Sequence, residues 1–256
     1  MIIRYSRLIN YKTFGDNNLW EDKNTYYLHK YSQGTKEWKI NRIYKITGSN
    51  IVKAIDYDKD CPREKYLDNM IYDQSLNIDL KINENDRGIY HENITRKKYE
   101  DKYNVKIVQV GSASPKNEPR ISSSTDGVIY KLINNEWVET DTIVEIKCPK
   151  KIPFLINRYL NNLKNGFKPY KWYHKHIRDS TYIQMQMQMY ILNKKFCIYI
   201  IDPEEGDMYI EKIPFNIKYI NENIIPKLNE FFIMMDLRID EMVKEYIKNI
   251  EPKILL

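Results

Sequence analysis

Cysteine is scarce in this sequence, and long apolar runs are absent. Among 256 residues there are three cysteines, Cys61, Cys148 and Cys197, and they lie far apart. They form neither a C-x-x-C metal pattern nor an even disulfide framework, so we expect a reducing, intracellular compartment. No run of about 18 apolar residues is present to form a membrane helix, and the start MIIRYSRLINYK lacks the small-residue cleavage site of a signal peptide. We therefore expect a soluble protein that is not exported by that route and uses no membrane.

Internal repeats and linkers rich in glycine or serine are also lacking, which argues against several domains. Hydrophobic residues make up 42% and charged residues 30% of the chain, and its 22 tyrosines are more than a disordered chain would carry. We expect one folded domain. The formal net charge of +6 permits an anionic partner such as nucleic acid without requiring one.

Helix and strand signals alternate along the chain. Helices are predicted within 35–55, over 85–103 and over 178–193. The segments VKIVQV, ISSSTDGVIY and TIVEIKC are short β-branched runs separated by turn residues, which predicts a small sheet. A final amphipathic helix is expected over 217–247, with an interruption or kink at Pro226.

The segment TIVEIKC carries two charged side chains within an apolar strand pattern. Side chains alternate between the two faces of a strand, so Glu145 and Lys147 share one face with Ile143. Burying an unpaired charge is costly, so both charges need a partner such as a metal, water or phosphate. The alternative is a solvated strand face that carries a simple ion pair.

A second carboxylate precedes this strand. The strand before it is expected to end in Ser-Thr-Asp126-Gly127, where glycine lets the chain turn and presents the aspartate. Taken alone, Asp-Gly more often marks a hairpin turn. A hairpin from Asp126 to Glu145 would bring two hard oxygen ligands and Lys147 to one edge, which suits an octahedral Mg²⁺ that keeps several waters. Together, these residues predict a phosphodiester-cleaving centre, with a metal for the charge and a lysine for the attacking water.

The motifs STDG and VEIKCP resemble the core of the PD-(D/E)XK nucleases, in particular the lambda-type exonuclease and YqaJ-like viral recombinase family. Four further segments resemble this family in the same order. EWKINRIYKITGSNI resembles its opening W-x-x-x-R-x-x-x-I-T-x-S element, and RGIYHENITRKKYEDKY resembles its G-x-x-x-E helix. TYIQMQMQMYI resembles its Gln-rich helix, and IDPEEGDMYIEKIPF resembles the strand pair that follows.

This resemblance extends from about Trp38 to the C-terminal helix. It implies an α/β (α+β) fold with a restriction-endonuclease-like PD-(D/E)XK core, in which helices flank a small mixed central sheet. It also divides the single nuclease domain into an N-terminal extension at 1–33, the core at 34–215 and a C-terminal helix at 216–256.

The same resemblance assigns roles to individual residues. Metal binding is implied for Asp126, Glu145, the backbone carbonyl of Ile146 and Glu92. Catalysis is implied for Asp126 and Glu145, for Lys147, which orients or polarises the attacking water, and for Gln184, which holds that water or the lysine. DNA phosphate binding is implied for Arg42, Ser49 and Ser124, and the planar fork of arginine suits that role.

Several assignments have a simpler structural alternative. For Glu92, the alternative is an i,i+4 surface pair with Arg96. For Arg42, it is a solvated helix arginine. On a helix, Gln184 and Gln188 share a face, so the alternating Met and Gln residues cannot all point at one site. The methionines among them are expected to fill the core.

The sequence departs from the family pattern in a few places. Thr125 stands where the family usually has proline before the metal aspartate, which we expect to loosen the turn without removing a ligand. The loop INNEWVETD between the two metal strands has no clear functional interpretation. A four-cysteine iron–sulfur cluster, found in some relatives, is excluded by three scattered cysteines. The implied cofactor is one or two Mg²⁺ ions per site, for which Mn²⁺ can substitute.

The leading hypothesis is a metal-dependent 5′-to-3′ exonuclease that acts on linear double-stranded DNA in viral or phage recombination or replication. The alternatives are a restriction-like or structure-specific DNA endonuclease and a non-catalytic DNA-binding module. The implied partners are double-stranded DNA ends, a single-strand annealing protein and further copies of the chain, as a trimer. Frequent Ile, Lys and Asn indicate an AT-rich genome such as that of a large DNA virus, and a viral protein would work in the host cytoplasm or nucleus.

Overall fold

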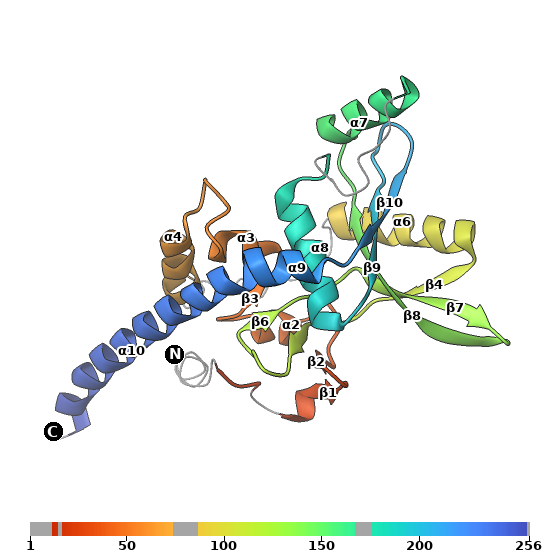
Figure 1. Cartoon of the computed structure of the whole chain (residues 1–256). Coiled ribbons are helices and arrows are strands. Elements are labelled where there is room, and N and C mark those ends of the chain that lie inside the picture. The colour runs from red at the N-terminus through yellow and green to blue at the C-terminus, as the bar shows by residue number, and fades with distance from the viewer. Residues whose placement is uncertain (1–11, 15–16, 74–86, 167–175, 255–256) are drawn as a thin grey trace.

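A five-stranded mixed sheet forms the centre of the molecule. The computed structural model describes residues 12–14, 17–73, 87–166 and 176–254 (Figure 1). The strands lie in the order β10, β9, β8, β7 and β4, which are Tyr209–Pro214, Phe196–Ile201, Glu136–Lys147, Gly127–Ile133 and Val105–Val108. β8 runs parallel to β9, and the other neighbouring pairs are antiparallel. The prediction of a small mixed central sheet is confirmed.

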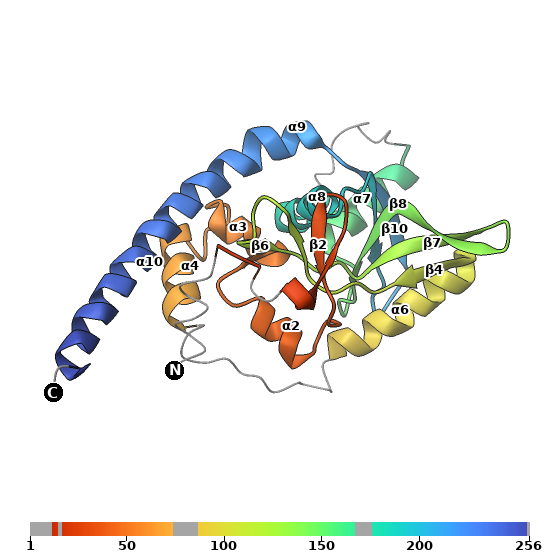
Figure 2. The same ribbon diagram turned by 90° about the horizontal axis from the view of Figure 1, so that it is seen from below.

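Two helices, α6 (Arg87–Tyr103) and α8 (Asp179–Leu192), pack on opposite faces of this sheet (Figure 2). On β8, Ile143 belongs to the core that α8 covers, while Val144 and Ile146 belong to the cluster on the α6 side. This is the alternation predicted for TIVEIKC, because successive strand side chains point to opposite faces. The two charged residues of that segment therefore lie on the α8 side.

The β7–β8 hairpin projects from the sheet and turns at Asn134 and Asn135 (Figure 2). Both asparagines have positive φ, 51° and 66°, which asparagine tolerates and which the favoured two-residue hairpin turns use. Trp137 pairs with Leu132, so most of INNEWVETD is strand. The prediction of a loop there is wrong, because two asparagines are enough to reverse the chain.

Part of the N-terminal extension joins the core in a second, three-stranded sheet. β1 (Trp20–Asp22) pairs with β2 (Tyr26–His29), and β2 pairs with β5 (Ala113–Pro115). A bridge between Ala113 and Ser123 then joins β5 to the segment that leads into β7. Residues 20–29 therefore support the middle of the chain, although no sequence motif marks them.

The opening motif folds into short elements. α2 (Lys36–Asn41) begins after Thr35, whose side chain accepts the backbone N–H of Trp38. β3 (Ile46–Thr47) pairs in parallel with β6 (Ile121–Ser122). The short helices that follow are a 3-10 turn at Gly48–Asn50, α3 at Ile51–Ala54, α4 at Arg63–Asp68 and a π-helical turn at Asn69–Asp73. The helices predicted within 35–55 are thus separated by a strand.

A long helical segment runs along one side of the molecule towards the C-terminus (Figure 1). It consists of α9 (Ile217–Tyr219), a π-helical turn (Ile220–Ile224) and α10 (Ile225–Ile254). The predicted interruption lies just before Pro226, whose missing N–H leaves the preceding turn without its usual donor. The helix continues beyond the predicted end at 247.

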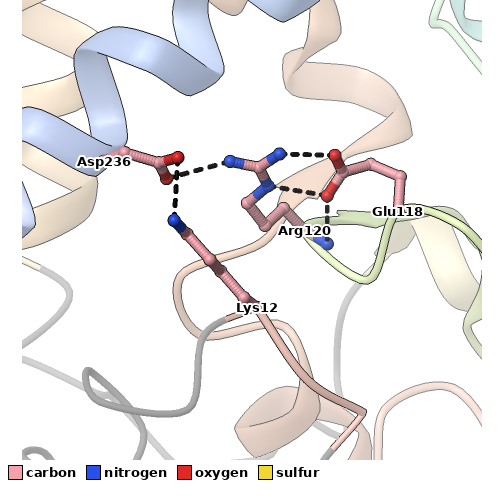
Figure 3. Close-up of polar contacts among 4 residues, drawn as sticks. All are labelled: Lys12, Glu118, Arg120 and Asp236. Carbon is pink, nitrogen blue, oxygen red and sulfur yellow. Dashed lines mark hydrogen bonds and ion pairs between the residues drawn. The ribbon is translucent and has the colours of Figure 1, made fainter.

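A polar network holds α10 against the core (Figure 3). Arg120 donates to Glu118 at 2.6 and 2.7 Å and to Asp236 of α10 at 2.9 Å. Lys12 forms an ion pair with the same aspartate at 2.9 Å. The carbonyl of Arg120 accepts the N–H of Ile46, so the network also connects α10 to β3.

One further helix, α7 (Phe154–Lys164), lies at the periphery of the molecule (Figure 1). Its first residue, Phe154, is exposed. Within the described ranges, no helix combines the length and the apolar character that crossing a membrane requires.

Candidate metal and nucleic-acid site

Asp126 lies directly before β7, near the end of β8, rather than at the end of a strand as predicted. Its Oδ2 accepts the backbone N–H of Ile146 at 2.6 Å. β7 begins at Gly127, which pairs with Val144, so the aspartate takes an N–H that lies beyond the part of β8 that pairs with β7. In a strand, the N–H and C=O of one residue point to the same edge. The carbonyl of Ile146 therefore faces the edge on which the Asp126 carboxylate lies.

Thr125 tightens the approach to this aspartate. Its side chain is buried, and its hydroxyl donates to the carbonyl of Val144 at 2.7 Å. Proline at this position would fix φ but could not make that bond. The expectation that threonine loosens the turn is wrong. Thr125 lacks the fixed φ of proline, but its hydroxyl holds the turn to β8 through the hydrogen bond to Val144.

The carboxylate of Glu145 is buried, with the residue 1% exposed, and both of its oxygens accept hydrogen bonds. Oε1 accepts from Lys147 at 2.5 Å and from Gln184 at 2.8 Å, and Oε2 accepts from Gln188 at 2.8 Å. A buried carboxylate needs such donors because its desolvation is costly. The ion pair with Lys147 forms, but the alternative of a solvated strand face is wrong.

The glutamines of α8 divide between two sides of the helix, as their spacing predicts. Gln184 and Gln188 both reach Glu145. Gln186 turns away: it donates to the carbonyl of Pro214 at 2.9 Å and accepts the N–H of Asn216 at 2.8 Å. The methionines between the glutamines are buried in the core, as predicted.

The electrostatics of the site favour a bound cation. Burial, and then the negative charges of Glu145 and Glu92, raise the pKa of Asp126 well above its ordinary value. Burial lowers the pKa of Lys147, but Glu145 and Asp126 outweigh it and raise that pKa, so the ammonium stays charged at neutral pH. The carboxylates repel one another, and a hard cation would relieve that repulsion.

The described residues do not bring three His, Cys, Asp or Glu side chains together at a metal-binding distance. The donor set available is therefore the carboxylates of Asp126 and Glu145 and the carbonyl of Ile146. This set fits a hard cation that keeps several of its waters, as Mg²⁺ does.

Glu92, on α6, approaches from the other face of the sheet. Its charge reaches Asp126, although it does not complete a three-carboxylate cluster. Arg96 is 9% exposed and donates to Asn93 at 2.7 Å. The simpler alternative placed a pair of Glu92 and Arg96 on the surface. The surface position is wrong, because Arg96 is buried.

Arg42 and Ser124 are joined through Trp38. The guanidinium of Arg42 lies over the indole, 4.1 Å from the ring centroid, and the indole N–H donates to Oγ of Ser124 at 2.9 Å. Arg42 is half-buried, and burial lowers its pKa, so it is not the fully solvated helix arginine of the simpler alternative. Ser49 is exposed and shares none of these contacts in the described part of the chain.

Sequence reasoning missed the contacts of several residues. Trp38 served only as a motif landmark, and nothing in its neighbourhood pointed to Ser124. The i,i+4 spacing predicted that Gln188 shares a face with Gln184, but not that both bind one carboxylate. The sequence also did not show that position 48 must be glycine. A Cβ there would lie 2.3 Å from Oγ of Ser123, so any larger residue would collide with it.

The comparisons with known proteins concern the family and the fold of the chain. The sequence model of the YqaJ-like viral recombinase domain family matches residues 37–195. An alkaline exonuclease from Laribacter hongkongensis, LHK-Exo, superposes with a TM-score of 0.62 at 21% identity, covering 84% of this chain and 99% of its own. LHK-Exo in complex with dAMP gives a TM-score of 0.61 with the same identity and coverage. No curated protein sequence matches the chain. The likeness confirms the PD-(D/E)XK fold.

Proposed function

This chain belongs to the YqaJ-like viral recombinase domain family, and we propose that it is a metal-dependent DNA nuclease. The observation that carries the proposal is the junction of β7 and β8. There the carboxylates of Asp126 and Glu145 converge with the ammonium of Lys147, which is bound to Glu145. A structural ion pair would need one carboxylate, whereas this site concentrates more negative charge than its lysine neutralises.

Asp126, Glu145 and the carbonyl of Ile146 are the proposed ligands of the metal, with Glu92 near a second position. When bound, Mg²⁺ or Mn²⁺ would neutralise phosphate charge and lower the pKa of a bound water. The backbone N–H of Ile146 orients the Asp126 carboxylate for this role.

Lys147 and Gln184 share one oxygen of Glu145 and so lie side by side. The raised pKa of Lys147 keeps it protonated, so it does not act as the base at neutral pH. Its role is to orient the attacking water and to stabilise the charge that develops on the phosphate. Gln184 holds Glu145 and fixes the side from which the lysine reaches that carboxylate.

For the substrate, we propose the end of linear double-stranded DNA, attacked from a 5′ phosphate. Arg42, whose guanidinium lies over the ring of Trp38, offers a planar fork for two phosphate oxygens, and Ser124 accepts the N–H of the same indole. The likeness to a protein described as an alkaline exonuclease supports attack from a DNA end. Ser49 is exposed, and we propose it as a further phosphate contact of this set.

A restriction-like endonuclease is the second candidate. The observation that favours it is that the contacts through Trp38 join only Arg42 and Ser124, whereas Ser49 shares none of them in the described part of the chain. A nuclease without an end-binding set would cut duplexes that have no ends.

One assay separates these candidates. We would incubate the chain with 5′-phosphorylated linear duplex and with covalently closed circular duplex, each with Mg²⁺, Ca²⁺ or EDTA. The exonuclease degrades only the linear DNA, and only with Mg²⁺. Cutting of the closed circle supports the endonuclease. DNA binding without cleavage of either substrate refutes the nuclease assignment and leaves a DNA-binding module.

We also propose that residues 1–256 act as one domain. β1 and β2 pair with β5, and the Arg120 network holds α10 to β3, so the extension and the C-terminal helix both bind the core. A single cooperative unfolding transition, followed by circular dichroism and by tryptophan fluorescence, is the expected result.

A further inference from the structure

The side chain of Gln188 is fully buried beneath the proposed metal site. Its Nε2 donates to Oε2 of Glu145 at 2.8 Å and to the carbonyl of Ser124 at 3.1 Å. We propose that Gln188 is a positioning residue that selects Oε2 of Glu145 as the metal-binding oxygen and fixes its distance from Asp126. This inference rests on the proposed function, because it concerns the metal site of the nuclease.

The selection of Oε2 follows from counting acceptor positions. Each carboxylate oxygen offers about two lone-pair sites. Oε1 accepts from both Lys147 and Gln184, which fills it, whereas Oε2 accepts only from Gln188 among the residues that the structure describes. Oε2 therefore retains the free acceptor position, and Gln188 sets the direction in which that position points.

The link to Asp126 runs through the backbone. Ser124 precedes that aspartate by two residues, and its carbonyl accepts from the same Nε2. Thr125 is tied to β8 through the carbonyl of Val144, and Asp126 through its own side chain. Ser124, Thr125 and Asp126 are therefore each held by a hydrogen bond. Of these three bonds, the one from Gln188 comes from a side chain that also binds the carboxylate of Glu145.

The orientation of the Gln188 amide is determined by Glu145. An ionised carboxylate only accepts hydrogen bonds, so the NH₂ group must face it. Among the described residues, Oε1 of Gln188 accepts no hydrogen bond. The amide is therefore arranged to serve the carboxylate and the Ser124 carbonyl, even though this leaves its own oxygen buried.

Calorimetry with Ca²⁺ tests this role without depending on turnover. Gln188→Met keeps the length of the side chain but removes both donors, and Gln186→Met is the matched control. Gln186 is also fully buried on α8, but its bonds lead to Pro214 and Asn216, away from the site. We expect Gln188→Met to weaken Ca²⁺ binding about 10- to 100-fold, the usual effect of losing a group that orients a metal ligand. Gln186→Met should bind Ca²⁺ like the wild type.

Mg²⁺ titration of cleavage gives a second measure. The half-saturating Mg²⁺ concentration should rise in Gln188→Met, while kcat at saturating Mg²⁺ should fall much less, because the reacting groups remain. If the methionine variant does not fold, as judged by its thermal melt, Gln188→Asn replaces it. This shorter amide cannot span both acceptors, and the same loss of affinity is expected.

Unchanged Ca²⁺ affinity in a folded Gln188 variant would overturn this inference and leave the proposed function standing. An equal loss in Gln186→Met would also overturn it, because the effect would then come from the helix as a whole. Absence of Ca²⁺ and Mg²⁺ binding by the wild-type chain would refute the proposed function itself, and the inference with it.

Discussion

The backbone N–H of Ile146 donates to Oδ2 of Asp126 across 2.6 Å, which ties the residue before β7 to the end of β8. The bond orients a carboxylate that is held close to the charges of Glu145 and Glu92. Without a cation, the carboxylates of Asp126, Glu145 and Glu92 therefore repel one another. Its residues serve the proposed chemistry at the expense of the stability of the metal-free chain.

Asp126→Asn should therefore stabilise the metal-free protein while it reduces cleavage about 10²-fold or more. Asparagine can still accept the N–H of Ile146 but carries no charge. An acid whose pKa is higher in the folded state favours folding below its unfolded pKa, and that contribution is lost as the pH rises through the folded pKa. The stability gained by the variant in EDTA, about 0.5–2 kcal/mol, should therefore grow from acidic to neutral pH.

Thermal melts in EDTA and in excess Mg²⁺ would measure this effect. Mg²⁺ should stabilise the wild type but not Asp126→Asn. A variant that melts below the wild type in EDTA at neutral pH would show that the carboxylate is not strained by its neighbours.

Lys147→Ala should lower cleavage about 10²-fold, the order observed when one charge-stabilising group is removed from a reacting centre. Because Glu145 and Asp126 raise its pKa, Lys147 stays charged across the neutral range. The pH profile of the wild type should therefore show no loss of activity from lysine deprotonation below about pH 10. Lys147→Arg, which keeps the charge, should recover part of the rate.

The control is Lys195→Ala, which removes an exposed lysine paired with Asp141 in the middle of β8. Initial rates on linear duplex at several pH values would compare the variants. Near-normal turnover by Lys147→Ala would make its pair with Glu145 purely structural.

The strand that carries the site was predictable because its pattern is local. Alternation in TIVEIKC predicts that Glu145 and Lys147 share a face, and the fold confirms it. The tie between Thr125 and Val144 was not predictable. It exists because β7 begins one residue after Asp126, and the start of a strand depends on its pairing with β8.

The nucleic-acid side of the site was less accessible to sequence reasoning. The contact of Trp38 with Ser124 joins segments 86 residues apart, and no local pattern encodes such a contact. β1 and β2 have no family motif, and their place beside β5 is fixed only by strand pairing. Ser49 is exposed, and its contact with a DNA phosphate stays a prediction.

Arg120→Ala should destabilise the chain by about 2–4 kcal/mol, towards the lower end of the cost of breaking a buried ion pair. The side chain of Arg120 is 15% exposed, and those of Glu118 and Asp236 are 18% and 32% exposed, so water can partly replace the lost partner. The guanidinium also packs 4.0 Å from the ring centroid of Phe232, and that contact is lost too. Urea unfolding would measure the difference.

Lys23→Ala is the control for that measurement, since it removes an exposed pair with Glu21 and should change stability little. If both variants unfold at the same urea concentration as the wild type, the network of Figure 3 does not hold α10 to the core.

Trp38 gives the sharpest test of DNA-end recognition. In the wild type, a 5′-phosphorylated end should be degraded faster than a 5′-hydroxyl end, because the charged phosphate gains bonds to Arg42 that a hydroxyl cannot make. Arg42→Ala should erase this preference and leave Ca²⁺ binding unchanged, since the arginine touches no proposed metal ligand.

Trp38→Leu, which removes the ring under the guanidinium, should reduce the preference about 2- to 5-fold, as expected for a partly exposed cation–π contact. Trp38→Phe keeps a ring there but loses the N–H to Ser124, so its preference should lie between that of Trp38→Leu and that of the wild type.

Trp137→Phe, on the exposed part of the β7–β8 hairpin, is the matched control and should leave the preference unchanged. Salt provides an independent measure, because each lost phosphate contact should flatten the dependence of log affinity on log salt by roughly 0.9. That change is expected for Arg42→Ala and not for Trp137→Phe. Rates would be measured on both kinds of end for every variant. Equal rates on phosphate and hydroxyl ends in the wild type would contradict end recognition, and they would favour the endonuclease because such an enzyme has no need to bind a terminal phosphate.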